Sequence, residues 1–349
     1  MNILFLIFLF VVSQEKNLRY LTGEFKIPIE YSKINQPLIK VCIGTPEKCY
    51  LFKLVTNANF CFIFNKDYKK GGFDIKQSST LEVIAEENII TYKDYILNGL
   101  KVKDTFYIES IKNAKLDSFT FYLINSGDFN ENEPYIGILG LGTFKKNSEF
   151  SLLNHFENKS FISDTSFGII DKHLYIGNFQ EFKDKKYRIG NIIKTMGSNY
   201  ELDLNCIIFY NYQKLENTKI YNRTQIVFFS PGANKIYCPK KFFSYIQNEI
   251  FKNYLNNKIC KIEDFTHTTV ITCNKKINND FLGQIKFFFG KWNLVFNFND
   301  LFLPINEEES QFEIVQIKND DRWVFGFPFF DKFNVVFDSK NLLIKIKNK

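Results

Sequence analysis

Short runs of apolar, aromatic and β-branched residues, each closed by turn-forming residues, recur along almost the whole chain. Runs of this length, with Gly, Asn, Asp or Pro between them, are typical of strands. The 41 phenylalanines agree, because aromatic side chains favour strands over helices. Helix-like spacing is limited to residues 150–156 and 240–255, so the sequence predicts an all-β fold. The strand-like runs include residues 25–29, 38–43, 50–55, 60–64, 119–124, 207–210, 225–229, 285–289 and 334–337.

A weak internal repeat divides the chain into two halves. In the first half, residues 55–57 (Val-Thr-Asn) are followed by residues 138–140 (Ile-Leu-Gly). In the second, residues 230–232 (Ser-Pro-Gly) are followed by residues 324–326 (Val-Phe-Gly). Each half therefore has a turn and, later, a strand end made of two apolar residues and a glycine.

The boundary between the halves is expected in the polar stretch 182–193, because no Gly-, Pro- or Ser-rich linker marks it. We predict one lobe over residues 20–183 and a second over residues 184–349.

One segment of the first half matches a known motif. Residues 43–46 (Ile-Gly-Thr-Pro) are followed by Val55 and Thr56 and then by the pair Cys61-Phe62. The segment resembles the first active-site segment of the pepsin-like aspartic proteases (peptidase A1 type). In that family the Ile-Gly-Thr-Pro turn precedes Asp-Thr-Gly-Ser and a Leu-Trp pair.

Further landmarks of the same family follow in the same order, so that the resemblance covers about residues 25–347. It implies an all-β, bilobal pepsin-like acid-protease fold, with two pseudo-symmetric β-barrel-like lobes and a cleft between them. The landmarks are residues 138–142, 174–177, 200–204 and 324–338.

Both positions that match the catalytic aspartates of the family carry other residues. Val55 stands at the first. At the second, the family places a Pro nine residues after its Asp, and counting back from Pro239 gives Ser230. Aspartic proteolysis needs two carboxylates that share one proton and activate one water. The resemblance therefore implies a catalytically inactive member with no catalytic residue intact.

The resemblance also nominates side chains that would line the cleft. Two follow the first turn position, two belong to the second turn, and one matches the Tyr of the flap, the hairpin that covers the cleft in this family. These candidates are Thr56, Asn57, Ser230, Gly232 and Tyr92.

The flap hairpin is predicted to be shortened, because Lys93 and Asp94 follow Tyr92 where the family has a glycine-rich tip. Nothing in the sequence shows that carboxylates from elsewhere, such as Asp94 or Glu263, replace the missing pair. A serine-protease role for Ser230 would need a neighbouring base, and no His lies near it in the sequence.

The first twelve residues are almost wholly apolar and are followed by Ser13-Gln14-Glu15. This run is too short to span a bilayer and is typical of the apolar core of a secretory signal peptide, which we assign to residues 1–14. A buried strand is the alternative. No second apolar run of membrane length follows, so we expect no membrane span after signal removal. The predicted location is the secretory pathway, ending outside the cell or in a vacuole- or lysosome-like lumen.

The seven cysteines agree with an oxidising compartment, and their odd number leaves at least one unpaired. Cys42 and Cys49 flank the Gly-Thr-Pro turn and are candidates for a bridge across a hairpin. Cys260 and Cys273 flank a polar segment, and the family resemblance implies a disulfide at this place. The unassigned cysteines are Cys61, Cys206 and Cys238.

Glycosylation sequons begin at Asn158 and Asn222. The sequence has no Cys-x-x-Cys pair and its three histidines are scattered, so no metal centre and no other cofactor is predicted.

The formal net charge is +7, and acidic and basic residues are interspersed without a basic helix or patch, which argues against nucleic-acid binding. The sequence favours a secreted, monomeric, non-proteolytic protein that binds a peptide or protein segment in the cleft. Two alternatives stay open. One is an aspartic-type endopeptidase with a divergent active site, and the other is a structural extracellular glycoprotein.

Overall fold

The structure, a computed structural model, describes residues 23–92, 95–129, 133–142, 148–192, 199–211, 216–221, 224–274, 283–318 and 321–349. The predicted signal peptide 1–14 and Asp94 lie outside these residues. Strands dominate the described chain, which confirms the all-β prediction. The chain forms two compact units. Unit 1 holds the described residues up to 189, Asn199 and residues 333–349, and unit 2 holds residues 190–192 and 200–332.

Unit 1 contains two sheets. An eight-stranded sheet has the order β2-β3-β4-β9-β5-β8-β7-β6, and β3 also pairs with β7. A six-stranded sheet has the order β1-β11-β10-β26-β27-β12, and its last strand continues into unit 2 at Gly190. The strands are β1 (Phe25–Pro28), β2 (Glu30–Tyr31), β3 (Pro37–Ile43), β4 (Lys48–Val55), β5 (Phe62–Phe64), β6 (Glu82–Tyr92), β7 (Tyr95–Ile108), β8 (Leu116–Gly127), β9 (Gly137–Gly140), β10 (Phe167–Ile170), β11 (His173–Ile176), β12 (Arg188–Asn191), β26 (Phe333–Asp338) and β27 (Leu343–Asn348). The helices are η1 (Ile75–Gln77), η2 (Glu109–Ala114), α2 (Leu152–Asn158) and η3 (Gln180–Lys183).

Unit 2 also contains two sheets. The larger has the order β13-β16-β25-β17-β24-β19-β23-β22 with β18 beside β19, and the smaller has the order β15-β14-β20-β21. The strands are β13 (Glu201–Leu204), β14 (Cys206–Asn211), β15 (Glu216–Tyr221), β16 (Gln225–Phe229), β17 (Ile236–Cys238), β18 (Cys260–Asp264), β19 (Thr268–Asn274), β20 (Gln284–Phe289), β21 (Trp292–Asn297), β22 (Phe302–Pro304), β23 (Glu309–Phe312), β24 (Ile314–Ile317) and β25 (Trp323–Phe325). The helices are α3 (Lys240–Tyr245), the π-helix η4 (Ile246–Ile250), α4 (Lys252–Asn256), η6 (Phe298–Leu301) and α5 (Phe327–Lys332).

The strand patterns explain these sheets. In β27, Ile344 and Ile346 are buried while the alternating Lys345 and Lys347 are half-buried, as expected of a strand with one face on the core. The whole of β26 is buried, because it lies between β10 and β27 in the middle of its sheet.

The chain beyond residue 332 belongs with unit 1, whereas the sequence places it in a second lobe over residues 184–349. The physical reason is strand pairing: Phe167 of β10 pairs with Phe337 of β26, and their rings stack with centroids 4.8 Å apart. The first and last strands of the described chain, β1 and β27, therefore belong to one sheet.

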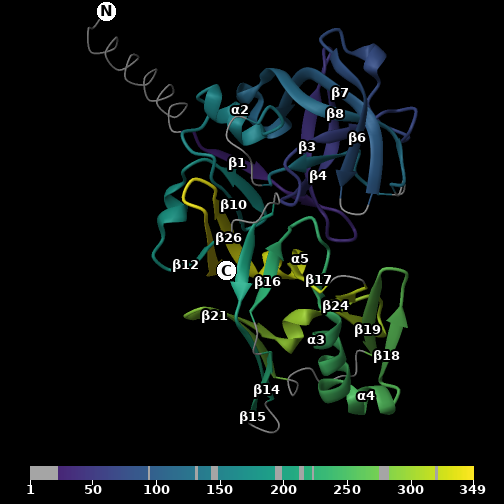
Figure 1. Ribbon diagram of the computed structural model, residues 1–349, viewed down its shortest axis with the longest axis vertical. Coiled ribbons are helices and arrows are strands. Elements are labelled where there is room, and N and C mark those ends of the chain that lie inside the picture. The colour runs from purple at the N-terminus through teal and green to yellow at the C-terminus, as the bar shows by residue number, and fades with distance from the viewer. Residues whose placement is uncertain are drawn as a thin grey trace, which may run out of the picture. The chain divides into compact units, whose positions relative to one another are not determined.

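The hairpin that carries Tyr92 differs from the shortened flap that the sequence predicts. Its strands β6 and β7 are 11 and 14 residues long and pair in antiparallel register up to Tyr92 and Tyr95 (Figure 1). The arms of the hairpin are therefore long.

The helix predicted over residues 240–255 is present as α3, η4 and α4, with a break at Phe251. Among the described residues, no helix combines the length and the apolar character that crossing a bilayer requires.

Candidate functional site

The first repeated turn lies at the end of β4 in unit 1. β9 runs parallel to β4, so that Leu54 pairs with Leu139 and Val55 with Gly140. The backbone N–H of Leu141 donates to the carbonyl of Val55 at 2.8 Å, and that of Gly142 donates to the carbonyl of Ala58 at 2.7 Å. These bonds hold the turn against the strand that follows it much later in the sequence.

The second repeated turn lies at the end of β16 in unit 2. β25 runs parallel to β16, so that Phe229 pairs with Phe325, and the N–H of Ser230 donates to the Phe325 carbonyl at 3.0 Å. Within the turn, the N–H of Ala233 donates a hydrogen bond to the Ser230 carbonyl at 3.0 Å. Phe327 donates its N–H to the Ala233 carbonyl at 2.7 Å.

The same threading surrounds both turns. In unit 1, β4 is parallel to β9, β9 is antiparallel to β5, and β5 is parallel to β8. In unit 2, β16 is parallel to β25, β25 is antiparallel to β17, and β17 is parallel to β24. The internal repeat seen in the sequence is thus a repeat of sheet topology.

Two glycines fix the alignment of the turns. A Cβ on Gly140 would lie 2.2 Å from the Phe60 carbonyl oxygen, and a Cβ on Gly326 would lie 2.2 Å from the Lys235 carbonyl oxygen. No side chain fits at either place. In unit 1, Val55 lies opposite Gly140. In unit 2, Phe229 pairs with Phe325, so the next residue of each strand, Ser230 and Gly326, corresponds to that pair. Val55 and Ser230 therefore hold equivalent positions in the two units.

Val55 points into the core of unit 1. Its side chain is 1% exposed and belongs to a buried cluster that also contains Ala58 and Tyr92. The Tyr92 ring meets the Phe62 ring edge-on, with centroids 5.7 Å apart. We call this set the Val55 cluster. Its buried members are Leu38, Val55, Ala58, Phe62, Phe64, Ile90, Tyr92, Leu97, Ile124, Phe129, Tyr135 and Ile138.

Ser230 is also buried, at 5% exposure, and aromatic rings lie beside its turn. The rings of Phe229, Phe325 and Phe329 form a triad with centroid separations of 5.7, 5.2 and 5.2 Å. Gly232 is buried in the same turn. Both turns are therefore packed on apolar side chains.

A thiol and a phenol near the first turn stay protonated at neutral pH. Burial raises the pKa of the Cys61 thiol to about 12, although a backbone hydrogen bond with Gly140 acts in the opposite direction. Burial also raises the pKa of Tyr92. Neither group supplies an anionic nucleophile or base at neutral or acidic pH.

Two buried carboxylates of unit 1, Asp74 and Asp104, have hydrogen-bond partners of their own. Asp74 bonds to the Lys66 ammonium at 2.5 Å. Asp104 accepts hydrogen bonds from Thr80 Oγ1 at 2.6 Å and from the Thr105 N–H at 2.7 Å.

Unit 2 contains a carboxyl group that the sequence did not single out. Glu201 is 2% exposed and pairs with Phe228, two residues before Ser230. Its only sequence signal was its place in a strand. Glu263, the carboxylate considered above, instead bonds to Thr272 Oγ1.

The remaining turn candidates differ in burial. Thr56 is 1% exposed, and Asn57 is half-buried. Of the glycosylation candidates, Asn158 is exposed at the end of α2, and Asn222 lies outside the described residues.

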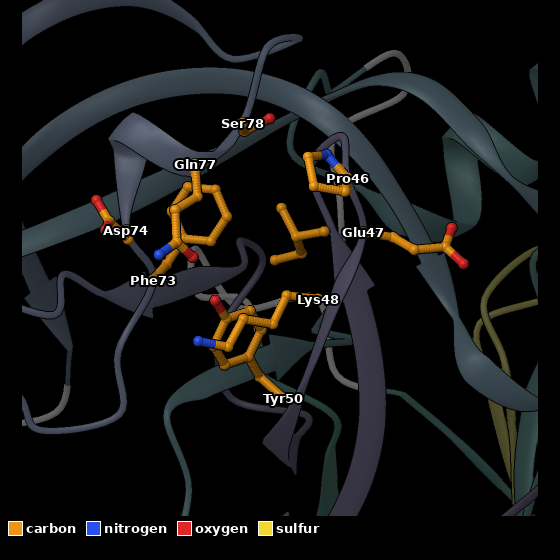
Figure 2. Close-up of a pocket in the computed structure, with 9 residues that line it drawn as sticks. Pro46, Glu47, Lys48, Tyr50, Phe73, Asp74, Gln77 and Ser78 are labelled. Atoms are coloured by element: carbon orange, nitrogen blue, oxygen red, sulfur yellow. The ribbon is translucent and has the colours of Figure 1, made fainter.

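A hollow of about 310 Å³ lies in unit 1 beside the residue 43–46 turn (Figure 2). Sequence reasoning missed it, because its lining comes from β3, β4 and the segment around η1. Those segments meet only in the folded unit.

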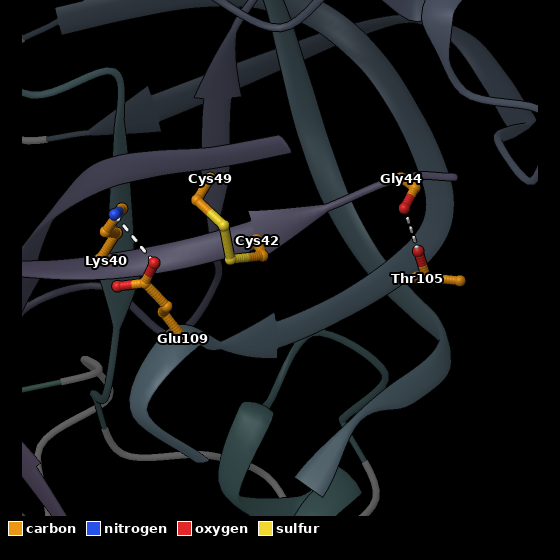
Figure 3. Close-up of a disulfide and its surroundings, with 6 residues drawn as sticks. All are labelled: Lys40, Cys42, Gly44, Cys49, Thr105 and Glu109. Carbon is orange, nitrogen blue, oxygen red and sulfur yellow. Dashed lines mark hydrogen bonds and ion pairs between the residues drawn. A yellow bond between two sulfur atoms is a disulfide. The ribbon is translucent and has the colours of Figure 1, made fainter. Parts of the chain in front are cut away.

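The structure contains both disulfides that the sequence nominates, Cys42–Cys49 and Cys260–Cys273. Each joins directly paired residues of neighbouring antiparallel strands. Cys61 and Cys238 are buried free thiols, and Cys206 is a half-buried one. Near the first bridge, the carboxylate of Glu109 pairs with Lys40 at 2.8 Å (Figure 3). Among the described residues, Cys42, Cys49 and Glu109 form the only group of three potential metal ligands that lie close together. The two sulfur atoms are bonded to each other in the disulfide.

Comparison with known proteins identifies the fold. A search of curated proteins returned no match. The family model of the eukaryotic aspartyl proteases matches residues 38–348, which include both repeated turns and every described strand except β1, β2 and the first residue of β3. The chain therefore belongs to the eukaryotic aspartyl protease family and has its pepsin-like, bilobal fold.

Proposed function

We propose that this chain is a non-proteolytic member of its family that binds a peptide or protein segment. The observation that carries the proposal is the pair of equivalent turn positions, which hold Val55 and Ser230. Neither side chain ionises in the range where a shared-proton carboxylate pair works.

The chemistry of the turns supports this reading. Val55 offers only methyl groups, and they are packed into the Val55 cluster. Ser230 offers a hydroxyl that can hold a water molecule but does not remove its proton at acidic pH. A dyad that binds and deprotonates one water therefore has neither of its two partners.

The backbone of the turns supports a retained binding role. Gly140 and Gly326 keep both close backbone approaches, although the carboxylates that such turns present in an active protease are missing. The turn geometry is thus maintained without the reaction, which is what a binding scaffold requires. The predicted peptide position, lined by Thr56, Asn57, Tyr92, Ser230 and Gly232, is part of the proposal.

A peptide-capture experiment tests it. Immobilised protein is incubated at pH 5 and pH 7 with a pool of peptides from a digested protein, and bound and unbound peptides are identified by mass spectrometry. We expect a defined subset to be retained intact. Asn57→Trp should abolish retention by filling the turn, whereas Asn88→Trp, at another half-buried Asn of unit 1, should leave it unchanged.

The alternatives give different results in the same experiment. New peptide termini would support an endopeptidase, with Glu201 as the first residue to substitute. Retention of no peptide at either pH would overturn the binding proposal and favour a structural glycoprotein.

A location in the secretory pathway is the second part of the proposal. The two disulfides support it, because such bonds persist in oxidising compartments. The test is expression with residues 1–14 present: a secreted, monomeric product with a glycan at Asn158 is expected. Retention in the cytosol with reduced cysteines would contradict it.

A further inference from the structure

The hollow beside the residue 43–46 turn is separate from both repeated turns. Its volume of about 310 Å³ is at the lower end of the range for small-molecule sites. Ile43, Pro46 and Phe73 give it apolar walls, and Ile43 and Phe73 are almost fully buried. Phe73 also packs edge-on against Tyr50, with ring centroids 6.1 Å apart. The interior therefore suits a small apolar group.

Three hydrogen-bond donors line the same hollow. The side chains of Lys48, Tyr50 and Gln77 extend into it from β4 and η1 (Figure 2). The Lys48 ammonium lies 5.5 Å from the centroid of the Tyr50 ring. Within the described part of the chain, none of the three side chains has a hydrogen-bond or ion-pair partner. They are therefore available to a ligand.

Tyr50 remains a donor over the whole physiological range. Its side chain is 6% exposed, and burial together with the nearby Asp74 raises its pKa to about 12. A protonated phenol beside an ammonium group favours an anionic acceptor over a cation.

The acidic groups of the lining are already engaged. Asp74 accepts from the Lys66 ammonium at 2.5 Å and from the Lys76 N–H at 3.1 Å, and Glu47 accepts from the Tyr107 hydroxyl. The hollow thus presents unused donors and occupied acceptors. A cationic ligand would find no free carboxylate, whereas an anionic ligand would find three free donors.

We propose that this hollow binds an organic carboxylate with a small apolar body. The carboxylate accepts from the Lys48 ammonium, the Tyr50 hydroxyl and the Gln77 amide, and the apolar body lies against Ile43, Pro46 and Phe73. The site does not depend on the proposed peptide-binding function, because it lies within unit 1 and uses no residue of the two repeated turns at Val55 and Ser230.

Three probes of nearly equal shape test the charge preference. They are 3-phenylpropionate, 3-phenylpropanol and 3-phenylpropylamine, titrated against the full-length protein by ligand-observed NMR. We expect the carboxylate to bind at least about tenfold more tightly than the alcohol or the amine, the effect of charge-assisted hydrogen bonds. Equal or tighter binding of the amine would overturn the proposal.

Single substitutions locate the site. Lys48→Met and Tyr50→Phe should each weaken carboxylate binding by about tenfold, since each removes one donor while keeping the side chain's bulk. The matched control is the Lys26–Tyr175 pair of the same unit, where the ammonium lies 5.4 Å from the ring centroid away from the hollow. Lys26→Met and Tyr175→Phe should leave the affinity unchanged. Unchanged affinity in Lys48→Met would contradict the assignment.

A fourth comparison distinguishes a free acid from a peptide terminus as the source of the carboxylate. The tripeptide Ala-Ala-Phe and its C-terminal amide are titrated in the same way. Binding of the acid form alone, lost in Lys48→Met, identifies a peptide C-terminus as a ligand. If neither tripeptide binds while 3-phenylpropionate still does, the site is restricted to small acids.

Discussion

Val55 and Tyr92 belong to one buried apolar cluster in unit 1, with 1% and 3% of their surfaces exposed. One ends β4 and the other ends β6, so the cluster joins the first repeated turn to the tip of a long hairpin. A carboxylate at position 55 would have to give up its hydration among these side chains. The cluster therefore makes Val55 part of the packing that holds the turn.

The first prediction concerns Val55→Asp. A carboxylate at position 55 would lose its hydration among apolar side chains, so at pH 7 the variant should lose about 3–5 kcal/mol of unfolding free energy. Burial would raise the folded-state pKa of the new carboxyl above its unfolded value. The folded state then binds the proton more tightly, and the loss should shrink as the pH falls towards 4. Urea unfolding at the two pH values measures this.

The control for that variant is Val83→Asp. Val83 lies on β6 in the same unit but is 43% exposed, so the change should stay within about 0.5 kcal/mol at both pH values. If Val55→Asp were as harmless as Val83→Asp, the description of the Val55 cluster would be wrong.

The second prediction tests the equivalence of the two turns. In Gly140→Ala and Gly326→Ala the new Cβ would come within 2.2 Å of a backbone oxygen, so each should lose about 3 kcal/mol or more. Gly290→Ala is the comparison. Gly290 has a φ of +60° but nothing within 4 Å of a new Cβ, and its substitution should cost only about 1 kcal/mol. A large difference between Gly140→Ala and Gly326→Ala would argue against equivalent turns.

The third prediction concerns the ion pair of Lys235 and Glu313 in unit 2, which is formed by side chains that are 15% and 5% exposed. Burial raises the pKa of Glu313 even though Lys235 opposes the shift. Lys235→Met leaves this carboxylate unpaired and should cost about 3–5 kcal/mol at pH 7.

The sign of the pH dependence follows from that shift. The folded-state pKa of Glu313 lies above its unfolded value and should rise further in Lys235→Met, so stability falls as the pH rises through this window. Adding Glu313→Gln should recover most of the loss at pH 7 and remove the pH dependence. A loss in Lys235→Met that is the same at pH 4.5 and pH 7 would contradict this.

The fourth prediction compares the disulfides. Replacing Cys260 and Cys273 by Ser opens a bridge with a sequence separation of 13 residues and should cost about 3 kcal/mol. Replacing Cys42 and Cys49 opens a separation of 7 residues and should cost about 0.5 kcal/mol less, because the shorter loop restricts the unfolded chain less. Thermal unfolding under non-reducing conditions measures both. A greater loss for the shorter bridge would show that native contacts, and not loop closure, determine the difference.

The sequence predicted the parts of the fold that depend on local pattern. The strands 225–229 and 334–337, the helical stretch 240–255 and the two disulfides are close to their predicted places. Short apolar runs closed by turn-forming residues and the order of short motifs carry this information directly. The repeat of turns and glycine-ended strands was also visible, because Gly140 and Gly326 are demanded by close backbone contacts that only glycine permits.

Other features arise only from contacts between distant segments. The return of β26 to unit 1 depends on its pairing with β10. In the sequence both strands are only short apolar runs, which do not show that they pair with each other. The length of the β6–β7 hairpin was missed because Glu82 to Asn88 carry few apolar residues at strand spacing and the register shifts there. Tyr50 and Gln77 likewise share a hollow that no sequence spacing reveals.

The most direct test of the central claim is hydrolysis of casein by the purified full-length protein between pH 3 and pH 6, with and without pepstatin. New peptide termini are counted by mass spectrometry over several days, and pepsin serves as the active control. We predict no pepstatin-sensitive cleavage at any pH. Pepstatin-sensitive turnover that persists through purification, and that is lost in Glu201→Gln or Ser230→Ala, would contradict the non-proteolytic account.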